Sequence, residues 1–326
     1  MYICKKDLKM INQVRNTVLS VLNKNNYGYI SPSDFNLYAE NAQMELFEEY
    51  FIGYNKAINM ENARQAGSDY AEVEGPIAET IEGFLVTNYL SRNTSTSYSA
   101  KNSFSFPSLT TTGTTAYYVL KVLCNTGIKT QGTNTSVVTN QLVCATGNFT
   151  TFDIQPGDIV VNTTTKAAAR ANSVVSNTVI ALDANIFTAT AQDFLILSQT
   201  SQEADKVSVG KITMLDSSLL TKPNEMYPSY TLEGDYINIY PKTINQFGQV
   251  ECVYFRHPKV PKWTYSTLAN GEPVFNQSQP DYQDFELPDE DVYRLVMKIL
   301  QYCGMSIREI EVTQFGIIQE KEINQQ

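Results

Sequence analysis

Few side chains in this sequence could carry out chemistry. The chain contains a single histidine, His257, so any catalytic triad or dyad that needs an imidazole must include it. His257 ends a predicted strand and precedes Pro258, a setting typical of a packing or surface histidine. A zinc site could use at most one histidine, and the five cysteines, Cys4, Cys124, Cys144, Cys252 and Cys303, include no CxxC pair. Their odd number and wide spacing predict buried free thiols in a reducing compartment.

One segment resembles a calcium-binding EF-hand loop. Residues Asn23–Asp34 lie between two predicted helices, with Gly28 at the sixth position and an acid at the twelfth. However, the loop offers only one carboxylate, since the first and third positions are Asn, the fifth is Tyr27 and the twelfth is Asp in place of a bidentate Glu. We therefore interpret it as a helix–turn–helix connection, with Gly28 at positive φ and Ser31 capping the second helix.

The acidic run Asp289–Asp291 could supply paired carboxylates to a glycosidase or a metal. Acids in the first turn of a helix also stabilise it by up to about 1 kcal/mol each, which explains the run without chemistry. The sequence therefore predicts a protein that is not an enzyme, with no catalytic residue, no cofactor and no metal.

Composition narrows the class of protein further. The 326 residues are 42% hydrophobic, with 20 Tyr and 15 Phe, which excludes a disordered chain. A net charge of −10, with no cluster of Lys or Arg, argues against a protein that grips nucleic acid through its phosphates. Neither an apolar leader nor a stretch approaching about 18 apolar residues occurs, so we expect a soluble protein made in a cytoplasm, without membrane contact.

Periodicity predicts helices near the two ends of the chain. Apolar residues recur at spacings of three and four over 11–22, and a second helix is expected from the Ser31-Pro32-Ser33-Asp34 start to about residue 58. The clearest helix begins near Pro288 and should end at Gly304. Short β-rich runs are expected at 117–123, 136–144, 158–161, 173–182 and 194–197, a hairpin at 230–241, and a further strand at 249–255.

These elements predict an α+β fold: a helical bundle with a β-hairpin or sheet segment and an inserted small β-barrel or sandwich domain. The expected domains are a discontinuous α+β core of residues 1–115 plus 206–326, and a β-rich insertion of residues 116–205. The Ser-, Thr- and Asn-rich stretch 93–115 is expected to be an exposed connection between them.

Taken together, these modules resemble a known family. The first module is an N-terminal helical pair that contains Gly28-Tyr29-Ile30-Ser31-Pro32-Ser33-Asp34-Phe35, and the second is the β-rich insertion. After the insertion come the hairpin Tyr230–Pro241, the run Val253-Tyr254-Phe255-Arg256-His257-Pro258, and Phe285-Glu286-Leu287-Pro288 at the start of a helix. The pattern resembles the head-to-tail connector, or ring, proteins of short-tailed bacteriophages, most closely those of crAss-like phages. The resemblance covers residues 10–60 and 226–316, and is weaker over 116–205.

The resemblance implies a virion structural protein in the phage neck or tail, made in the host bacterial cytoplasm. It implies a homo-oligomeric ring, typically of twelve copies, that contacts the portal protein and other ring proteins. Genomic DNA would pass through the channel without specific binding, and an acidic wall suits that role because like charges repel. The C-terminal Phe315, Ile317 and Ile318 would dock on a neighbouring layer or pack on their own subunit.

Two other functions stay open at this stage. A receptor-binding or tail-fibre-attachment protein would use the β-rich insertion as a carbohydrate-binding module, with clustered Tyr or Trp in a cleft of 116–205. A wall-degrading glycosidase would need two acids about 5–10 Å apart in a cleft.

Overall fold

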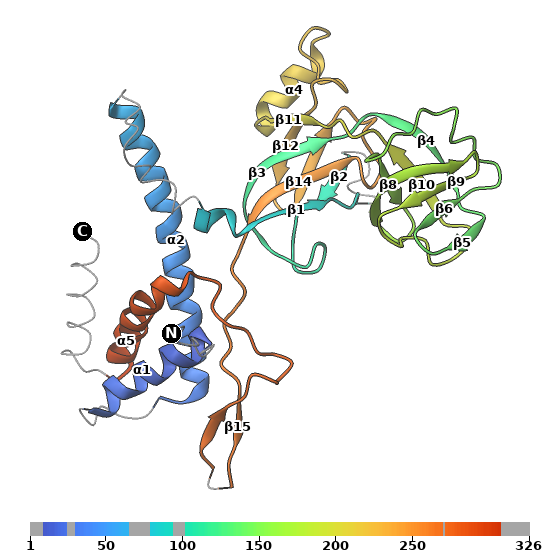
Figure 1. The fold of residues 1–326 in the computed structure, drawn as a ribbon. Helices are drawn as coiled ribbons and strands as arrows, with labels where there is room; N and C mark the ends of the chain where they lie inside the picture. The colour runs from blue at the N-terminus through green and yellow to red at the C-terminus, as the bar shows by residue number, and fades with distance from the viewer. Residues whose placement is uncertain (1–8, 25–29, 65–78, 94–101, 270, 308–326) are drawn as a thin grey trace. The chain divides into compact units, whose positions relative to one another are not determined.

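The computed structural model describes residues 9–24, 30–64, 79–93, 102–269 and 271–307. The chain divides into two compact units (Figure 1). Unit 1 combines Met1–Phe84 with Pro258–Gln326, and unit 2 is the continuous segment Leu85–His257.

Unit 1 is built around three helices, α1 (Met10–Lys24), α2 (Pro32–Arg64) and α5 (Val292–Ile307), the last preceded by the 3-10 helix η2 (Asp289–Asp291). Helix α5 packs against both α1 and α2, and its buried residues include Leu295, Ile299 and Cys303. The N-terminal start of α2 is as predicted, since the Asp34 amide donates to the Ser31 hydroxyl over 3.1 Å. The predicted end of α5 at Gly304 is wrong, because the helix continues to Ile307.

A two-stranded hairpin of β15 (Tyr265–Thr267) and β16 (Pro273–Phe275) extends from the helices of unit 1 (Figure 1). Its base is fixed by Trp263, which is buried against the helical core. The Trp263 indole N–H donates to Asn12, and the Arg15 guanidinium lies 3.7 Å from the ring centroid. All three residues of β15 are exposed.

Unit 2 contains two sheets, and the first brings together strands from distant parts of the chain. In spatial order they are β1 (Leu85–Tyr89), β14 (Val250–Arg256), β3 (Ala116–Cys124), β11 (Gln202–Lys206), β12 (Ser229–Glu233), β13 (Tyr236–Tyr240) and β2 (Ser103–Ser105). The β12–β13 hairpin matches the one predicted at 230–241. β11 and β12 are parallel, so a crossover must join them, and this crossover contains helix α4 (Val209–Ser217).

The second sheet has seven strands among the described residues, and all of them lie within residues 128–197. Its order is β4 (Ile128–Thr133), β10 (Asp193–Leu197), β7 (Ile159–Asn162), β8 (Ala167–Ser176), β9 (Val179–Leu182), β6 (Gln141–Val143) and β5 (Ser136–Val138). β8 pairs with β7 at one end and β9 at the other, and bulges interrupt the second pairing. The run 136–144, expected to be one strand, folds as a hairpin around Asn140, which has φ 55°.

The predicted fold class is wrong. The structure is mainly β, with two seven-stranded sheets and about 25% helix, so it is not a helical bundle carrying a small β insertion. Several strands were missed, among them β1, β2, β4 and β11. β1 was not predicted, and β2 lies in the stretch expected to be an exposed connection, although Phe104 is fully buried there. The run 117–123 corresponds to β3, which joins the first sheet rather than the second.

Candidate interaction surface

Of the sequence-predicted candidates for chemistry, His257 and Asp291 make packing contacts, whereas Asp289 and Glu290 are exposed. The His257 ring meets the Tyr117 ring edge-on, with centroids 5.2 Å apart, and the His257 amide donates to the Thr115 carbonyl over 3.0 Å. In η2, the buried Asp291 carboxylate accepts hydrogen bonds from the Tyr50 hydroxyl and from Arg294 over 3.2 Å. Asp291 therefore connects α2 to α5.

Four cysteines lie in the part of the chain that the structure describes, and all are buried and free as predicted: Cys124, Cys144, Cys252 and Cys303. Burial raises the pKa of Cys124 and Cys252 to about 12, so their reactive thiolate forms are disfavoured. Three of the predicted features lie outside the described residues: Cys4, residues 25–29 of the EF-hand-like loop, and the tail residues Phe315, Ile317 and Ile318. Among the residues described, no group of three or more His, Cys, Asp or Glu could hold a metal ion.

Five of the six most exposed large apolar side chains of unit 2 lie on α4 and the loop that returns from it to β12. Leu219 and Leu220 are 99% and 97% exposed, so almost all of each side chain is in contact with solvent. Met214, Met226 and Tyr227 are also strongly exposed. We call these five residues the α4 crest. Because contiguous exposed apolar patches are typical of interaction sites, we take the α4 crest as the candidate interaction surface.

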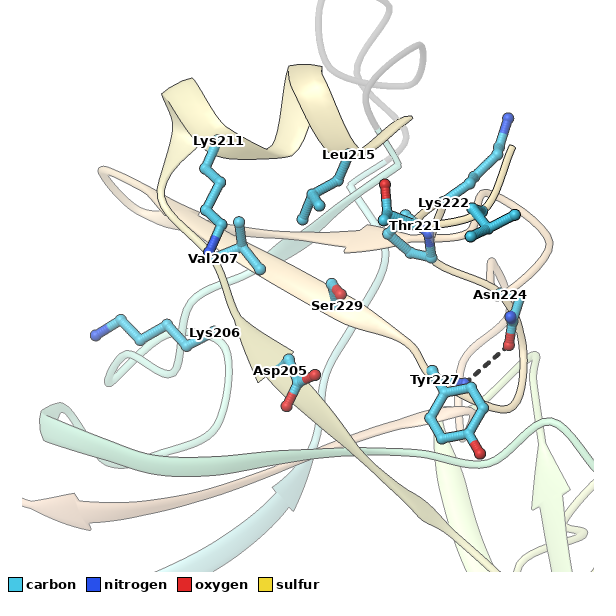
Figure 2. Close-up of a pocket in the computed structure, with 12 residues that line it drawn as sticks. Asp205, Lys206, Val207, Lys211, Leu215, Thr221, Lys222, Asn224, Tyr227 and Ser229 are labelled. Carbon is cyan, nitrogen blue, oxygen red and sulfur yellow. Dashed lines mark hydrogen bonds between the residues drawn. The ribbon is translucent and has the colours of Figure 1, made fainter. Parts of the chain in front are cut away.

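Local hydrogen bonds hold the loop that carries the crest. The Asn224 side-chain oxygen accepts from the amides of Met226 and Tyr227, each over 2.9 Å, which closes an Asx turn. The bond to Tyr227 is drawn in Figure 2. At the start of the loop, the Lys222 amide donates to the Ser218 carbonyl over 3.0 Å. The loop is therefore pre-formed, which lowers the entropy cost of binding a partner.

A cleft of about 510 Å³ lies beside the crest, between α4, the end of β11 and the loop (Figure 2). Its lining residues include Lys206, Lys211 and Lys222, and the ammonium groups of Lys206 and Lys222 point outward from it (Figure 2). Lys222 pairs with Asp216 over 3.4 Å, and the remaining carboxylate at the wall is that of Asp205. Lining amines of this kind pair with carboxylates or phosphates, whereas the lining includes no imidazole or thiol for nucleophilic or proton-transfer chemistry.

Residues 206–229 were predicted to belong to the α+β core, but no functional residue was predicted among them. The signal available there was the Leu219-Leu220 pair, which is apolar but is followed by the turn-forming Thr-Lys-Pro-Asn. Without helix or strand periodicity, the sequence does not predict whether these apolar residues are buried or exposed. Their almost complete exposure could be learned only from the structure.

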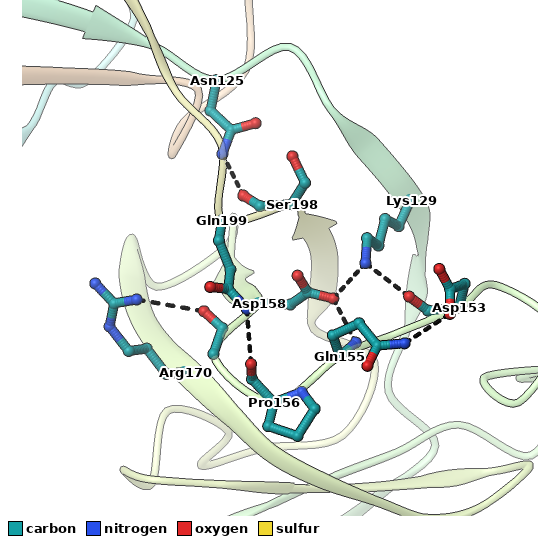
Figure 3. Close-up of polar contacts among 10 residues, drawn as sticks. Asn125, Lys129, Asp153, Gln155, Pro156, Asp158, Arg170, Ser198 and Gln199 are labelled. Carbon is teal, nitrogen blue, oxygen red and sulfur yellow. Dashed lines mark hydrogen bonds and ion pairs between the residues drawn. The ribbon is translucent and has the colours of Figure 1, made fainter.

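A second polar cluster, in the sheet of residues 128–197, has a structural role (Figure 3). The carboxylate of Asp158, a residue only 1% exposed, accepts from the Lys129 ammonium and from the Gln155 amide, both over 2.7 Å. Lys129 also donates to the Asp153 carbonyl over 2.7 Å. Because these groups satisfy one another, the cluster holds the 153–158 turn on β4 and presents no free group to a ligand.

Comparison with known proteins adds no family to this description. No protein-family model matches the chain, and no curated protein has a matching sequence. None of the helices in the described ranges has both the length and the apolar character needed to cross a membrane.

Proposed function

We propose that this chain is a virion structural protein that acts by repeated self-association, as a ring subunit of a phage neck or tail. The observation that carries the proposal is the α4 crest, because Leu219 and Leu220 are almost completely exposed. Leaving such side chains in water costs free energy that burial against a partner recovers, at about 25 cal/mol per Å² of apolar area. In a ring, each modest contact is repeated around the circle and avidity increases.

The charge distribution also supports a ring with a passive channel. Unit 1 contains 13 Lys and Arg against 23 Asp and Glu, while unit 2 contains 11 of each. The whole net charge of −10 is therefore in unit 1. In our proposal unit 1 borders the channel, where like-charge repulsion allows DNA to pass without adhering. The portal protein and other neck or tail rings are the proposed partners.

The carbohydrate-binding alternative finds less support. It required aromatic side chains clustered in a cleft of residues 116–205, whereas Tyr117 and Tyr118 lie on β3 of the first sheet and Tyr117 packs against His257. The single tryptophan, Trp263, is buried in unit 1. The interaction surface that the structure favours is the α4 crest.

The solution mass of the purified full chain tests the proposal. We expect light scattering to show oligomers that grow with protein concentration, and co-sedimentation with portal-bearing particles of the virus that encodes the chain. The double variant Leu219→Ser, Leu220→Ser should lose most of this association without a change in thermal stability. Leu109→Ser is the matched control, since Leu109 is 72% exposed elsewhere in unit 2. A wild-type chain that stays monomeric and leaves portal-bearing particles unbound would overturn the proposal.

A further inference from the structure

One exposed face of α2, in unit 1, carries apolar and acidic side chains, which complement the apolar α4 crest and the lysines of the neighbouring cleft. Leu37 and Ile52 are 54% and 66% exposed, and their spacing of fifteen residues places them on one helix face, about 22 Å apart along the axis. The exposed Glu40 and Glu48 lie on or beside this face. We call these four residues the α2 face.

The α2 face borders the network that joins α2 to α5, but its two carboxylates take no part in that network. Glu45 and Glu49 pair with Lys298 over 3.1 and 2.7 Å, and Glu49 also pairs with Arg294 over 2.6 Å. Within the described residues, by contrast, Glu40 and Glu48 make no ion pair. Their carboxylates are thus available to a partner that supplies cations.

The lysine-lined cleft supplies such cations next to apolar side chains. Lys222 is paired with Asp216, but Lys206 and Lys211 have no ion-pair partner among the residues that the structure describes. One surface therefore combines lysines with apolar side chains, since Lys206 and Lys211 line the same cleft as Leu220, and the other carries carboxylates on the same helix face as Leu37 and Ile52. An interface between them would bury apolar groups and juxtapose opposite charges.

We propose that the α4 crest and lysine cleft of one copy dock on the α2 face of a second copy of this chain. The inference rests on the proposed function and specifies its subunit contact. Because the two surfaces differ, each copy uses its α4 crest to bind one neighbour and its α2 face to bind another. Such a head-to-tail contact generates a closed ring when the rotation between copies closes, and a filament when it does not.

Cysteine cross-linking tests which surfaces meet. In a Cys4→Ser background, where the described native thiols are buried, Leu220→Cys and Ile52→Cys are prepared as separate single variants of the full chain. Under mild oxidation we expect a covalent dimer only when the two are mixed, since a disulfide needs Cα atoms within about 7 Å. Leu220→Cys mixed with Leu109→Cys is the matched control and should give none. Dimers from Leu220→Cys alone would show a crest-to-crest contact and overturn the inference.

Charge reversal tests the electrostatic part. Lys206→Glu with Lys211→Glu should weaken self-association by about tenfold or more, and so should Glu40→Lys with Glu48→Lys, because like charges then oppose one another. The chain carrying all four changes should recover most of the wild-type association. Thermal unfolding of each variant confirms that it folds.

The outcomes separate this inference from the proposed function. A wild-type chain that never self-associates and ignores portal-bearing particles removes the proposed function, and this contact with it. A wild-type chain that forms oligomers, but shows neither the mixed cross-link nor recovery in the fourfold variant, overturns only the contact between the crest and the α2 face.

Discussion

The buried ion pair between Lys129 and Asp158 gives the sharpest prediction for the stability of unit 2. The Lys129 side chain is 20% exposed and that of Asp158 is 2% exposed, and their charged groups are 2.7 Å apart. In Asp158→Ala the Gln155 amide loses its acceptor and the Lys129 ammonium keeps only the Asp153 carbonyl. A hydrogen bond to a charged group contributes about 1.5–3 kcal/mol, and a neutral one about 1 kcal/mol.

The expected loss in the free energy of unfolding for Asp158→Ala is therefore about 3 kcal/mol, which lowers the melting temperature of a unit of this size by about 6–12 °C. Urea unfolding followed by circular dichroism measures the loss. The double variant Lys129→Met, Asp158→Asn should lose at least about 1.5 kcal/mol less than the sum of its single changes, because it leaves no unpaired buried charge.

Lys222→Ala is the matched control, because its ion pair with Asp216 is exposed, with side chains 54% and 47% accessible. An exposed pair contributes up to about 1 kcal/mol, so this change should have little effect. The reasoning would be refuted if Asp158→Ala cost no more than Lys222→Ala, or if the losses at Lys129 and Asp158 were simply additive.

Three further predictions concern the backbone, the core and the thiols. Gly248→Ala should lower the free energy of unfolding by about 2–3 kcal/mol, because φ at Gly248 is +91° and the new Cβ would lie 2.5 Å from a valine methyl. Gly210→Ala in α4 should raise it by up to about 1 kcal/mol, because the new Cβ would meet nothing within 4 Å. Phe47→Ala should cost about 3–5 kcal/mol, because Phe47 is 1% exposed and packs edge-on against two phenylalanines. Burial raises the pKa of Cys124 and Cys252 from 9.0 to about 12, so unfolding by base should become easier between pH 9 and 12, where the unfolded thiols lose protons first.

Each of these has a direct readout. Urea unfolding compares Gly248→Ala with Gly210→Ala, and equal effects of the two changes would contradict the steric argument. Fluorescence of the single tryptophan, which lies in the same unit as Phe47, reports the core substitution, and a loss under 1 kcal/mol would not fit a buried ring. Urea unfolding at pH 8 and at pH 10 should give a lower free energy of unfolding at pH 10, and no decrease would contradict the raised thiol pKa.

The sequence by itself determined the elements whose signals are local. The stripe over 11–22, the Ser31 cap and the Gly-Asp turn between β12 and β13 depend on residues within a few positions of one another, so helix and hairpin formation follow from them. The burial of the described cysteines also followed from their scatter.

Only the tertiary structure decided how strands far apart in the chain pair. β1 pairs with β14 through contacts such as Leu85 with Phe255, and β11 lies parallel to β12 across the α4 crossover. Such registers depend on which surfaces remain uncovered after local elements form, and no local period encodes them. For the same reason the exposure of Leu219 and Leu220 could not be predicted: an apolar residue is inside or outside according to whether the rest of the chain reaches it.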